Sequence, residues 1–230
     1  ILAEQKKYDE AADQLLRVAT RPGNPNPHQA YYYMGRIRVE QGKFPEAEKN
    51  LTKAMSMKPQ HVESALALYE LMRKTGREAE AVRMLSSYQE KFGPNKEVAK
   101  ELGQFFLEKE DYNKAEEHLQ VVESFERDNL NVKMKIALIL IEKKEYKRAA
   151  NRLEEILLVA PESDKIRFYL GAVYEELGHS RAAIKNYRQV PVDSQYYVEA
   201  MIHAAHLYRQ SGDLPEAQKV MEAAIKTKED

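Results

Sequence analysis

An alanine recurs every 34 residues over most of the chain, and this period constrains the fold more than any other feature of the sequence. The positions are Ala47, Ala81, Ala115, Ala149, Ala183 and Ala217. Four residues after each alanine stands a bulky apolar residue, the series being Leu51, Leu85, Leu119, Leu153, Tyr187 and Met221. Ten residues before it stands another, the series being Ile37, Leu71, Phe105, Ile139, Val173 and Leu207. A fixed period without insertions predicts an array of stacked units and not one enlarged core.

Each period contains two segments with helical spacing and a short turn between them. In the clearest unit the segments cover residues 30–41 and 45–57, with Gly42 at the break and Pro45 at the start of the second segment. Glycine favours the left-handed end of a helix, and proline is tolerated in a first turn because an N–H there has no helical partner. The recurring alanine predicts a close crossing of the two helices. A composition with only nine glycines and nine prolines agrees with a largely helical chain.

The period divides the chain into units that we expect to form one continuous solenoid. Full units are expected at 28–61, 62–95, 96–129, 130–163, 164–197 and 198–230. Residues 1–27 are expected to hold a partial unit, which Tyr8 and Ala11 fit, followed by a linker that makes the first spacing 36 residues. Pro191 falls inside an expected final helical turn, so we expect a kink or an early helix end there.

This pattern resembles the tetratricopeptide-repeat family over essentially the whole chain. The family's small residue, turn glycine, crossing alanine and late proline stand at Gly35, Gly42, Ala47 and Pro59, and the first three recur at Gly171, Gly178 and Ala183. The resemblance implies an all-α fold in which antiparallel helix pairs form a right-handed superhelical solenoid. The family's usual tryptophan is absent. Residues 190–200 are similar to repeats of bacterial envelope-associated members, and the chain begins with Ile, so we expect a fragment or processed chain of bacterial origin.

Charge and hydropathy argue against two classes of partner. The 36 basic and 37 acidic residues nearly cancel and form no basic run, whereas a nucleic-acid-binding domain normally carries a basic excess. The longest apolar stretch, residues 136–141, is far shorter than the roughly 20 residues that span a bilayer. We therefore expect neither nucleic-acid binding nor membrane insertion.

Motifs of catalysis are missing as well. Cysteine is absent, which excludes disulfides and thiolate metal sites. The chain contains no glycine-rich phosphate loop and no Gly-x-Ser-x-Gly or His-Glu-x-x-His motif. His203 and His206 have metal-ligand spacing, but no third ligand stands at a comparable spacing. We expect no catalytic residue, metal or cofactor, and the compartment stays open between cytoplasm and periplasm.

The resemblance further implies a concave groove, lined by the first helix of each pair, that holds segments of partner proteins. In the unit at 130–163 the core is expected from Ile136, Ala137, Ile139 and Leu140. The groove then receives Met134, Leu138 and Ile141, although the packing of the repeat itself does not require apolar residues there. The slot of Met134 is occupied in the other units by Tyr32, Leu66, Lys100, Phe168 and Ile202.

Lysines lie beside these apolar positions. Some family members hold a carboxyl terminus with a clamp of lysine, asparagine and arginine on three successive first helices. The best match here is Lys100, Gln104, Lys135, Lys165 and Tyr169. Two lysines agree, but the asparagines and the arginine are missing, so we do not expect this clamp. The three lysines remain candidates for binding an acidic group, and Tyr169 remains a candidate contact.

These observations predict a protein-interaction scaffold that binds a peptide or helix of a partner in its groove. The predicted anchors are Met134, Leu138, Ile141, Phe168 and Ile202. The alternative interpretation is that such residues pack against neighbouring helices or are scattered exposed apolar residues, which are common. Two other functions stay open, namely an element that self-associates through the solenoid ends or the groove, and the non-catalytic arm of a larger enzyme or envelope protein.

Overall fold

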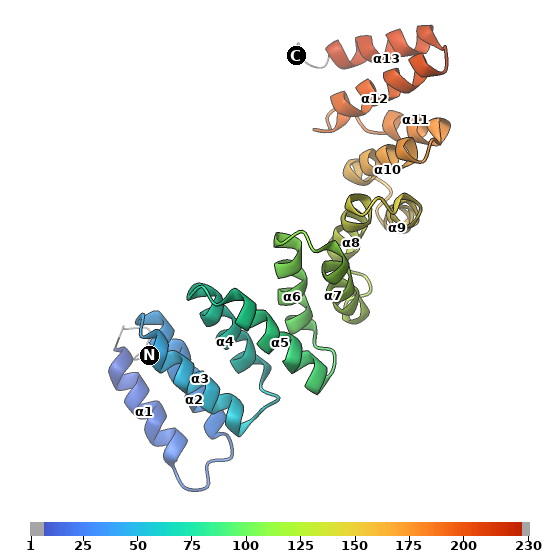
Figure 1. Ribbon diagram of the computed structural model, residues 1–230. Coiled ribbons are helices and arrows are strands. Elements are labelled where there is room, and N and C mark those ends of the chain that lie inside the picture. The colour runs from blue at the N-terminus through green and yellow to red at the C-terminus, as the bar shows by residue number, and fades with distance from the viewer. Residues whose placement is uncertain (1–6, 227–230) are drawn as a thin grey trace. The chain divides into compact units, whose positions relative to one another are not determined.

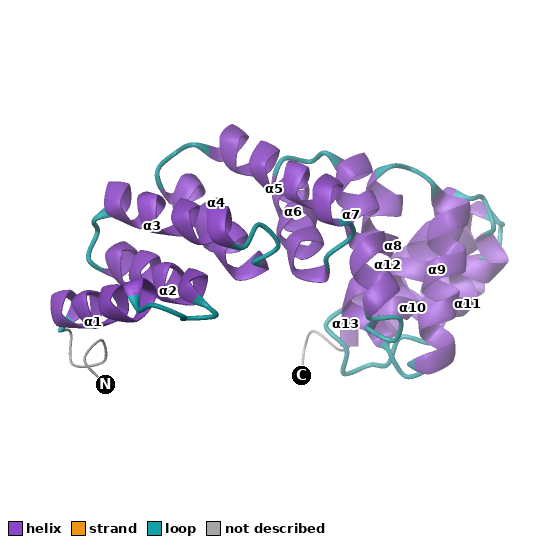
Figure 2. Ribbon diagram, turned by 90° about the horizontal axis from the view of Figure 1, so that it is seen from below, coloured by secondary structure: helices purple, strands orange, loops and turns teal. Residues whose placement is uncertain are grey.

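The computed structural model describes residues 7–226, and every regular element within them is an α-helix (Figure 1 and Figure 2). The chain packs as two compact units, Ile1–Glu108 and Lys109–Asp230. The first unit contains α1 (Tyr8–Thr20), α2 (Pro27–Glu40), α3 (Phe44–Met57), α4 (Val62–Lys74), α5 (Glu78–Phe92) and α6 (Lys96–Glu108). The second contains α7 (Tyr112–Phe125), α8 (Leu130–Glu142), α9 (Tyr146–Val159), α10 (Asp164–Glu176), α11 (Ser180–Arg188), α12 (Tyr197–Gln210) and α13 (Leu214–Lys226). The predicted all-α repeat fold is confirmed.

The helices keep the period of the sequence. The second helices of successive pairs begin 34 residues apart, at Phe44, Glu78, Tyr112, Tyr146, Ser180 and Leu214. The start of α1 precedes that of α3 by 36 residues, so α1 corresponds to a second helix and the predicted linker follows it. With nine residues α11 is the shortest described helix, and it ends at Arg188, three positions before Pro191. The expected early end is confirmed.

The recurring alanines lie where the two helices of a pair cross. Five of them, Ala47, Ala81, Ala115, Ala149 and Ala183, expose no surface to solvent. Glycines on the facing helices permit the closest approaches: a Cβ on Gly35 would lie 2.7 Å from Leu51 Cδ2, and one on Gly171 would lie 2.7 Å from Tyr187 Cδ1. Both distances are well below an ordinary carbon–carbon contact. The crossing inferred from the sequence pattern is confirmed in these pairs.

The turn inside each pair places one residue in the left-handed region. Four repeats use glycine there, for example Gly42 with φ of 71°. The other two hold Glu110 and Lys144 in the same slot, with φ of 56° and 58°. A side chain in this region costs roughly 1–2 kcal/mol. Helix pairing therefore imposes the turn even where the local sequence does not favour it.

Replacing Ala149 with leucine is expected to lower the free energy of unfolding by about 1–3 kcal/mol, because the larger side chain overpacks the α8–α9 crossing. Urea unfolding followed by circular dichroism measures this change. Lys147→Ser, at an exposed position on the same helix, is the matched control and should alter stability by less than about 0.5 kcal/mol. Equal effects of the two substitutions would show that the crossing is misplaced.

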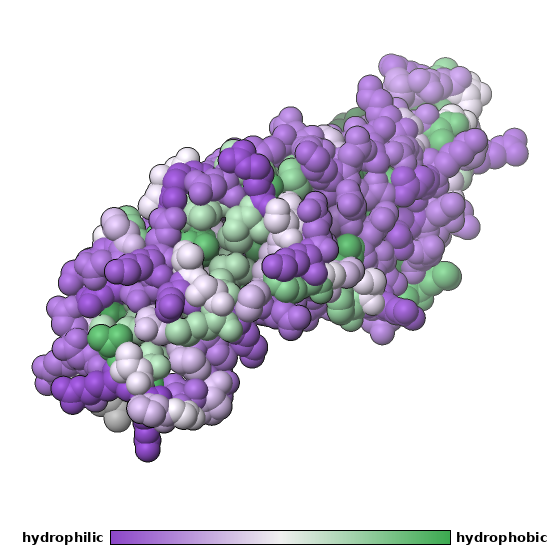
Figure 3. All heavy atoms as spheres, turned by 60° about the horizontal axis from the view of Figure 1, so that its bottom comes forward, coloured by the Kyte–Doolittle hydropathy of each residue, from purple (hydrophilic) through white to green (hydrophobic). Residues whose placement is uncertain are grey.

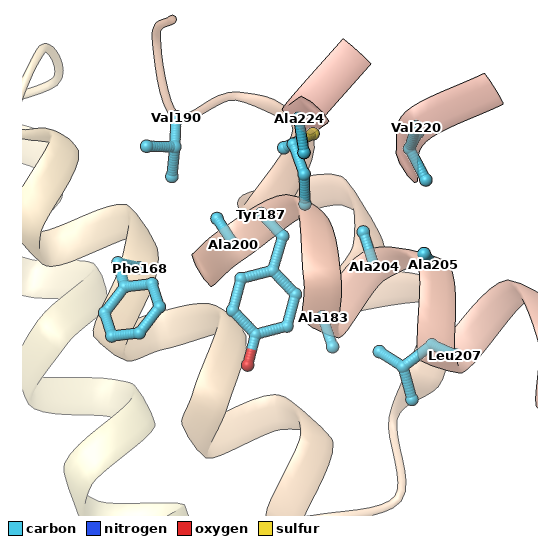
Figure 4. Packing of buried hydrophobic residues seen from close by; sticks show 11 residues of the cluster. Phe168, Ala183, Tyr187, Val190, Ala200, Ala204, Ala205, Leu207, Val220 and Ala224 are labelled. Atoms are coloured by element: carbon cyan, nitrogen blue, oxygen red, sulfur yellow. The ribbon is translucent and has the colours of Figure 1, made fainter. Parts of the chain in front are cut away.

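In the second unit, the core cluster formed by α10, α11, α12 and α13 is built around Tyr187 of α11 (Figure 4). Its side chain is fully buried, and its ring centroid lies 6.0 Å from that of Phe168 and 5.3 Å from that of His203. The hydroxyl donates to Glu175 over 2.8 Å. Burial, reinforced by this hydrogen bond to a carboxylate, raises the pKa of the phenol. The small residues Ala183, Ala200 and Ala204 belong to the same cluster (Figure 4).

In the first unit two histidines are buried at the start of α2 and just before α4. His28 is 4% exposed, His61 is 8% exposed, and their ring centroids are 4.9 Å apart. His61 Nδ1 lies 2.8 Å from the hydroxyl oxygen of Ser64, whereas His28 Nε2 has no hydrogen-bond partner in the described part of the chain. Desolvation lowers the pKa of both imidazoles, and this effect outweighs the opposing influence of the Glu63 carboxylate, which lies 3.3 Å from His61 Nε2. Both rings are therefore neutral in the folded protein near pH 7.

Acidification is expected to destabilise the first unit. In the unfolded chain these histidines are protonated near pH 6.5, whereas in the folded chain they are protonated only at a lower pH. Their contribution to stability is thus complete above about pH 6.5 and is lost as the pH falls below it. We expect the melting temperature to fall by roughly 2–5 °C between pH 7.5 and 5.5.

The variant His28→Phe should reduce this pH dependence. An identical pH dependence of the melting temperature in the variant and the wild-type chain would contradict a role of the buried histidines. The pKa of His118 is also lowered, but its titration is common to both proteins.

Candidate functional site

The helix α8 is apolar on two opposite faces. The expected core residues Ile136, Ala137, Ile139 and Leu140 are each at most 2% exposed, so this part of the prediction is confirmed. Met134, Leu138 and Ile141 follow one another at spacings of four and three, which places them in one stripe on the opposite face. All three are only partly buried. A helix with one buried face does not need apolar residues in such a stripe.

The same three slots are mixed in character on the other first helices. In the slot of Leu138 stand Arg36, Glu70, Gln104, Ala172 and His206, and in the slot of Ile141 stand Val39, Arg73, Leu107, Glu175 and Arg209. Among the described first helices, α8 alone is apolar in all three slots. We call Met134, Leu138 and Ile141 the α8 stripe.

The sequence predicts a groove position for Phe168, whereas the structure buries this residue. Phe168 is 9% exposed and belongs to the core of the second unit. Its ring stacks on Tyr196 with a centroid distance of 5.2 Å and meets Tyr169 edge-on at 5.7 Å. The cause is the segment leading into α12, because Tyr196 at its end covers the slot. Phe168 therefore stabilises the packing and offers little surface to a partner.

The other residues in this slot differ in exposure. Tyr32 is partly buried, with its ring 5.4 Å from that of His61, the residue that precedes α4. Leu66 is also partly buried, and Ile202 on α12 is 46% exposed. In two repeats, then, the residue preceding the next first helix packs on this slot, so an apolar residue there has a structural reason as well as a functional one.

The candidate lysines are exposed. Lys135 on α8 and Lys165 on α10 belong to the second unit, whereas Lys100 on α6 belongs to the first. None of the three lies within ion-pair distance of a carboxylate in residues 7–226, which leaves their charges available to an acidic group. Tyr169 is half-buried, and burial raises the pKa of its phenol.

The two histidines of α12 have separate partners. His203 Nδ1 lies 2.9 Å from a carboxylate oxygen of Glu175, and His206 Nε2 lies 2.8 Å from Nε2 of Gln210. In the described residues, no three His, Cys, Asp or Glu side chains come together in an arrangement that could hold a metal ion. Each helix in the same part of the chain is too short or too polar to cross a membrane.

Exposed apolar side chains are scattered over much of the surface. The face shown in Figure 3 is largely hydrophilic, with small hydrophobic patches separated by polar groups. Leu158 at the end of α9 is 85% exposed, and the sequence reasoning missed it. A signal was available, because its slot holds Ser56, Glu90 and Ser124 in the preceding repeats.

Comparison with known proteins agrees with this architecture. Two tetratricopeptide-repeat family models match the sequence, one over residues 38–100 and the other over residues 198–230. The chain contains tetratricopeptide repeats (TPR). Outside the two matched ranges its helix pairs keep the same 34-residue spacing. A search of curated proteins found no match.

Solved structures, two of them described as TPR proteins, have a similar fold. The C-terminal part of a TPR repeat-containing protein from Cytophaga hutchinsonii matches with a TM-score of 0.67 and 15% identity, over 98% of this chain and 92% of that one. YrrB, described as a TPR protein with an unusual peptide-binding site, matches with a TM-score of 0.62 and 16% identity, over 78% and 93%. MamA from Desulfovibrio magneticus matches with a TM-score of 0.57 and 16% identity, over 72% and 93%. At these identities the matches show the fold alone.

Proposed function

We propose that this chain is a protein-interaction scaffold that binds a peptide or helix of a partner protein along α8. The observation that carries the proposal is the α8 stripe, which lies opposite the core face of its helix and is partly exposed. An apolar stripe at helical spacing suits a partner helix or an apolar peptide, because either can cover it with side chains at matching intervals. TPR repeats are in general scaffolds for protein interaction, which supports the same function.

Charged groups near the stripe favour a partner with an acidic portion. Lys135 follows Met134 on α8, and Lys165 stands on the next first helix of the same unit. A charge without a partner in the free protein contributes to orientation and to the rate of association when an opposite charge arrives. Tyr169 and Ile202 extend the candidate contacts along the second unit, and Tyr32, Leu66 and Lys100 are the corresponding candidates in the first.

Site-specific photocrosslinking tests this proposal. A photoreactive phenylalanine analogue at position 138 should form a crosslink to a partner in extracts of the native organism, whereas the same group at position 147, on an exposed part of α9, should not. Mass spectrometry identifies the crosslinked protein. Crosslinks between two copies of this chain would instead favour self-association, and equal crosslinking from positions 138 and 147 would refute binding at the stripe.

A further inference from the structure

A cleft opens in the second unit, and residues of α9, α10 and α11 line it, with none from the α8 stripe. Its volume is about 630 Å³. The apolar part of its lining comes from Leu157 and Leu158 at the end of α9, Pro161 just after α9, Leu170 of α10 and Ala182 of α11. Leu158 exposes most of its side chain at the mouth of the cleft. A cleft of this size suits a short segment of a partner and not a whole helix face.

Comparison with the preceding repeat explains why the cleft is open. The equivalent groove between α7 and α9 is bridged by an ion pair between Glu123 and Arg152, with an N–O distance of 3.0 Å. A second pair joins Glu116 to Arg148 over 2.5 Å.

Thirty-four residues later the same four slots hold Leu157, Asn186, Ala150 and Ala182. Both ion pairs are thus replaced by apolar or neutral residues. Asn186 donates to the carbonyl of Ala182 on its own helix and does not bridge the groove. The groove between α9 and α11 therefore lacks the two ion pairs that bridge the groove between α7 and α9, and its apolar surface is open.

The edge of the cleft carries two cations, Arg167 and Lys185. Arg167 donates one hydrogen bond to the carbonyl of Pro161 over 2.6 Å and another to the amide of Gln189, and both acceptors are neutral. Lys185 is exposed on the α11 side. Neither cation lies within ion-pair distance of a carboxylate in the part of the chain that the structure describes.

The lining also contains one carboxylate, that of Glu154. Glu154 accepts a hydrogen bond from the hydroxyl of Tyr174, which itself lines the cleft. A guanidinium held in a fixed orientation by neutral acceptors still has donors to offer a carboxylate. The cleft therefore combines an apolar floor with two cations and one carboxylate, and this excess of positive charge attracts an incoming acidic group.

We propose that this cleft binds a short segment of a partner protein in which a bulky apolar side chain stands next to a carboxylate. The apolar side chain packs against Leu157, Leu158 and Leu170, and the carboxylate pairs with Arg167 and Lys185. Charge complementarity selects an acidic segment over a basic one. This site is independent of the α8 stripe, so the chain can engage two segments, from one partner or from two.

The test uses a phage-displayed library of random decapeptides selected on the wild-type chain. The library is first depleted on Leu157→Glu/Asn186→Arg, which copies the Glu123–Arg152 pair and closes the cleft with residues that the preceding repeat already accommodates. Enriched peptides are expected to combine a leucine-, phenylalanine- or methionine-sized residue with aspartate or glutamate. Their affinity should fall at least tenfold in Arg167→Gln and in the closed variant, and should be unchanged in Leu138→Ser.

Three results would overturn the proposal. One is the absence of any peptide that distinguishes the wild-type chain from the closed variant. Another is an enriched set that lacks acidic residues. The third is binding that Leu138→Ser abolishes and Arg167→Gln preserves, which would move the peptides to the α8 stripe. Circular dichroism melts establish that each variant is folded, and Arg167→Gln, at a partly exposed position, keeps the test decisive if the double variant is unstable.

Discussion

Replacing Tyr187 with alanine is expected to lower the free energy of unfolding of the second unit by about 3–5 kcal/mol, the largest effect of any single substitution considered for this chain. The ring is fully buried between α10, α11 and α12, and its removal leaves a cavity lined by Phe168 and His203. It also removes the hydroxyl that donates to Glu175. Urea unfolding monitored by circular dichroism measures the loss.

Two further variants separate the causes of this loss. Tyr187→Leu installs the residue that four other repeats carry in this slot, so it should cost roughly 1–2 kcal/mol, mostly for the missing hydrogen bond. Gly171→Ala should be destabilising alone, because its Cβ would lie 2.7 Å from the tyrosine ring. In the Tyr187→Ala background, Gly171→Ala should lower the free energy of unfolding much less than it does in the wild-type chain, because the ring that its Cβ would meet is absent. Strictly additive effects of the two substitutions would contradict the packing described here.

The repeat architecture was predictable because each of its rules recurs. A residue that appears once carries little information, whereas alanine in the crossing slot of six repeats specifies a close approach of two helices. The turns within the helix pairs show that a position in the repeat can predict backbone conformation even where the residue type does not. Glu110 and Lys144 adopt the left-handed conformation that their neighbours reach with glycine, so the position within the repeat predicts the conformation better than the residue type does.

The candidate surface was harder to predict because it depends on neighbours outside the repeat pattern. Phe168 occupies the same slot as Met134, yet Tyr196 covers it. Tyr196 ends an irregular segment that exists because α11 stops before Pro191, and no pattern within one repeat describes such a segment. The cleft beside Leu158 depends on residues from three helices. An alignment of the repeats nevertheless indicates the cleft, because the slot of Leu157 holds the charged residue Glu123 in the preceding repeat.

Leu138→Ser is expected to weaken binding of a partner on α8 by about ten- to a hundredfold, equivalent to about 1–3 kcal/mol. Leu138 is the central residue of the α8 stripe, with Met134 one turn before it and Ile141 one turn after. A central apolar contact loses both its own burial and the exclusion of water from its neighbours when it is truncated. Since Leu138 points away from Ile136 and the rest of the core, the fold should survive the substitution.

The measurement is the dissociation constant of the partner captured through position 138, obtained by calorimetry for the wild-type chain and for each variant. Lys147→Ser is the matched control, and its affinity should equal that of the wild-type chain. Raising the salt concentration should weaken binding further if Lys135 and Lys165 meet acidic groups, because screening acts on exposed charges. An unchanged affinity in Leu138→Ser, or a loss of helical signal in that variant, would assign the stripe to packing within the protein and remove it from the binding surface.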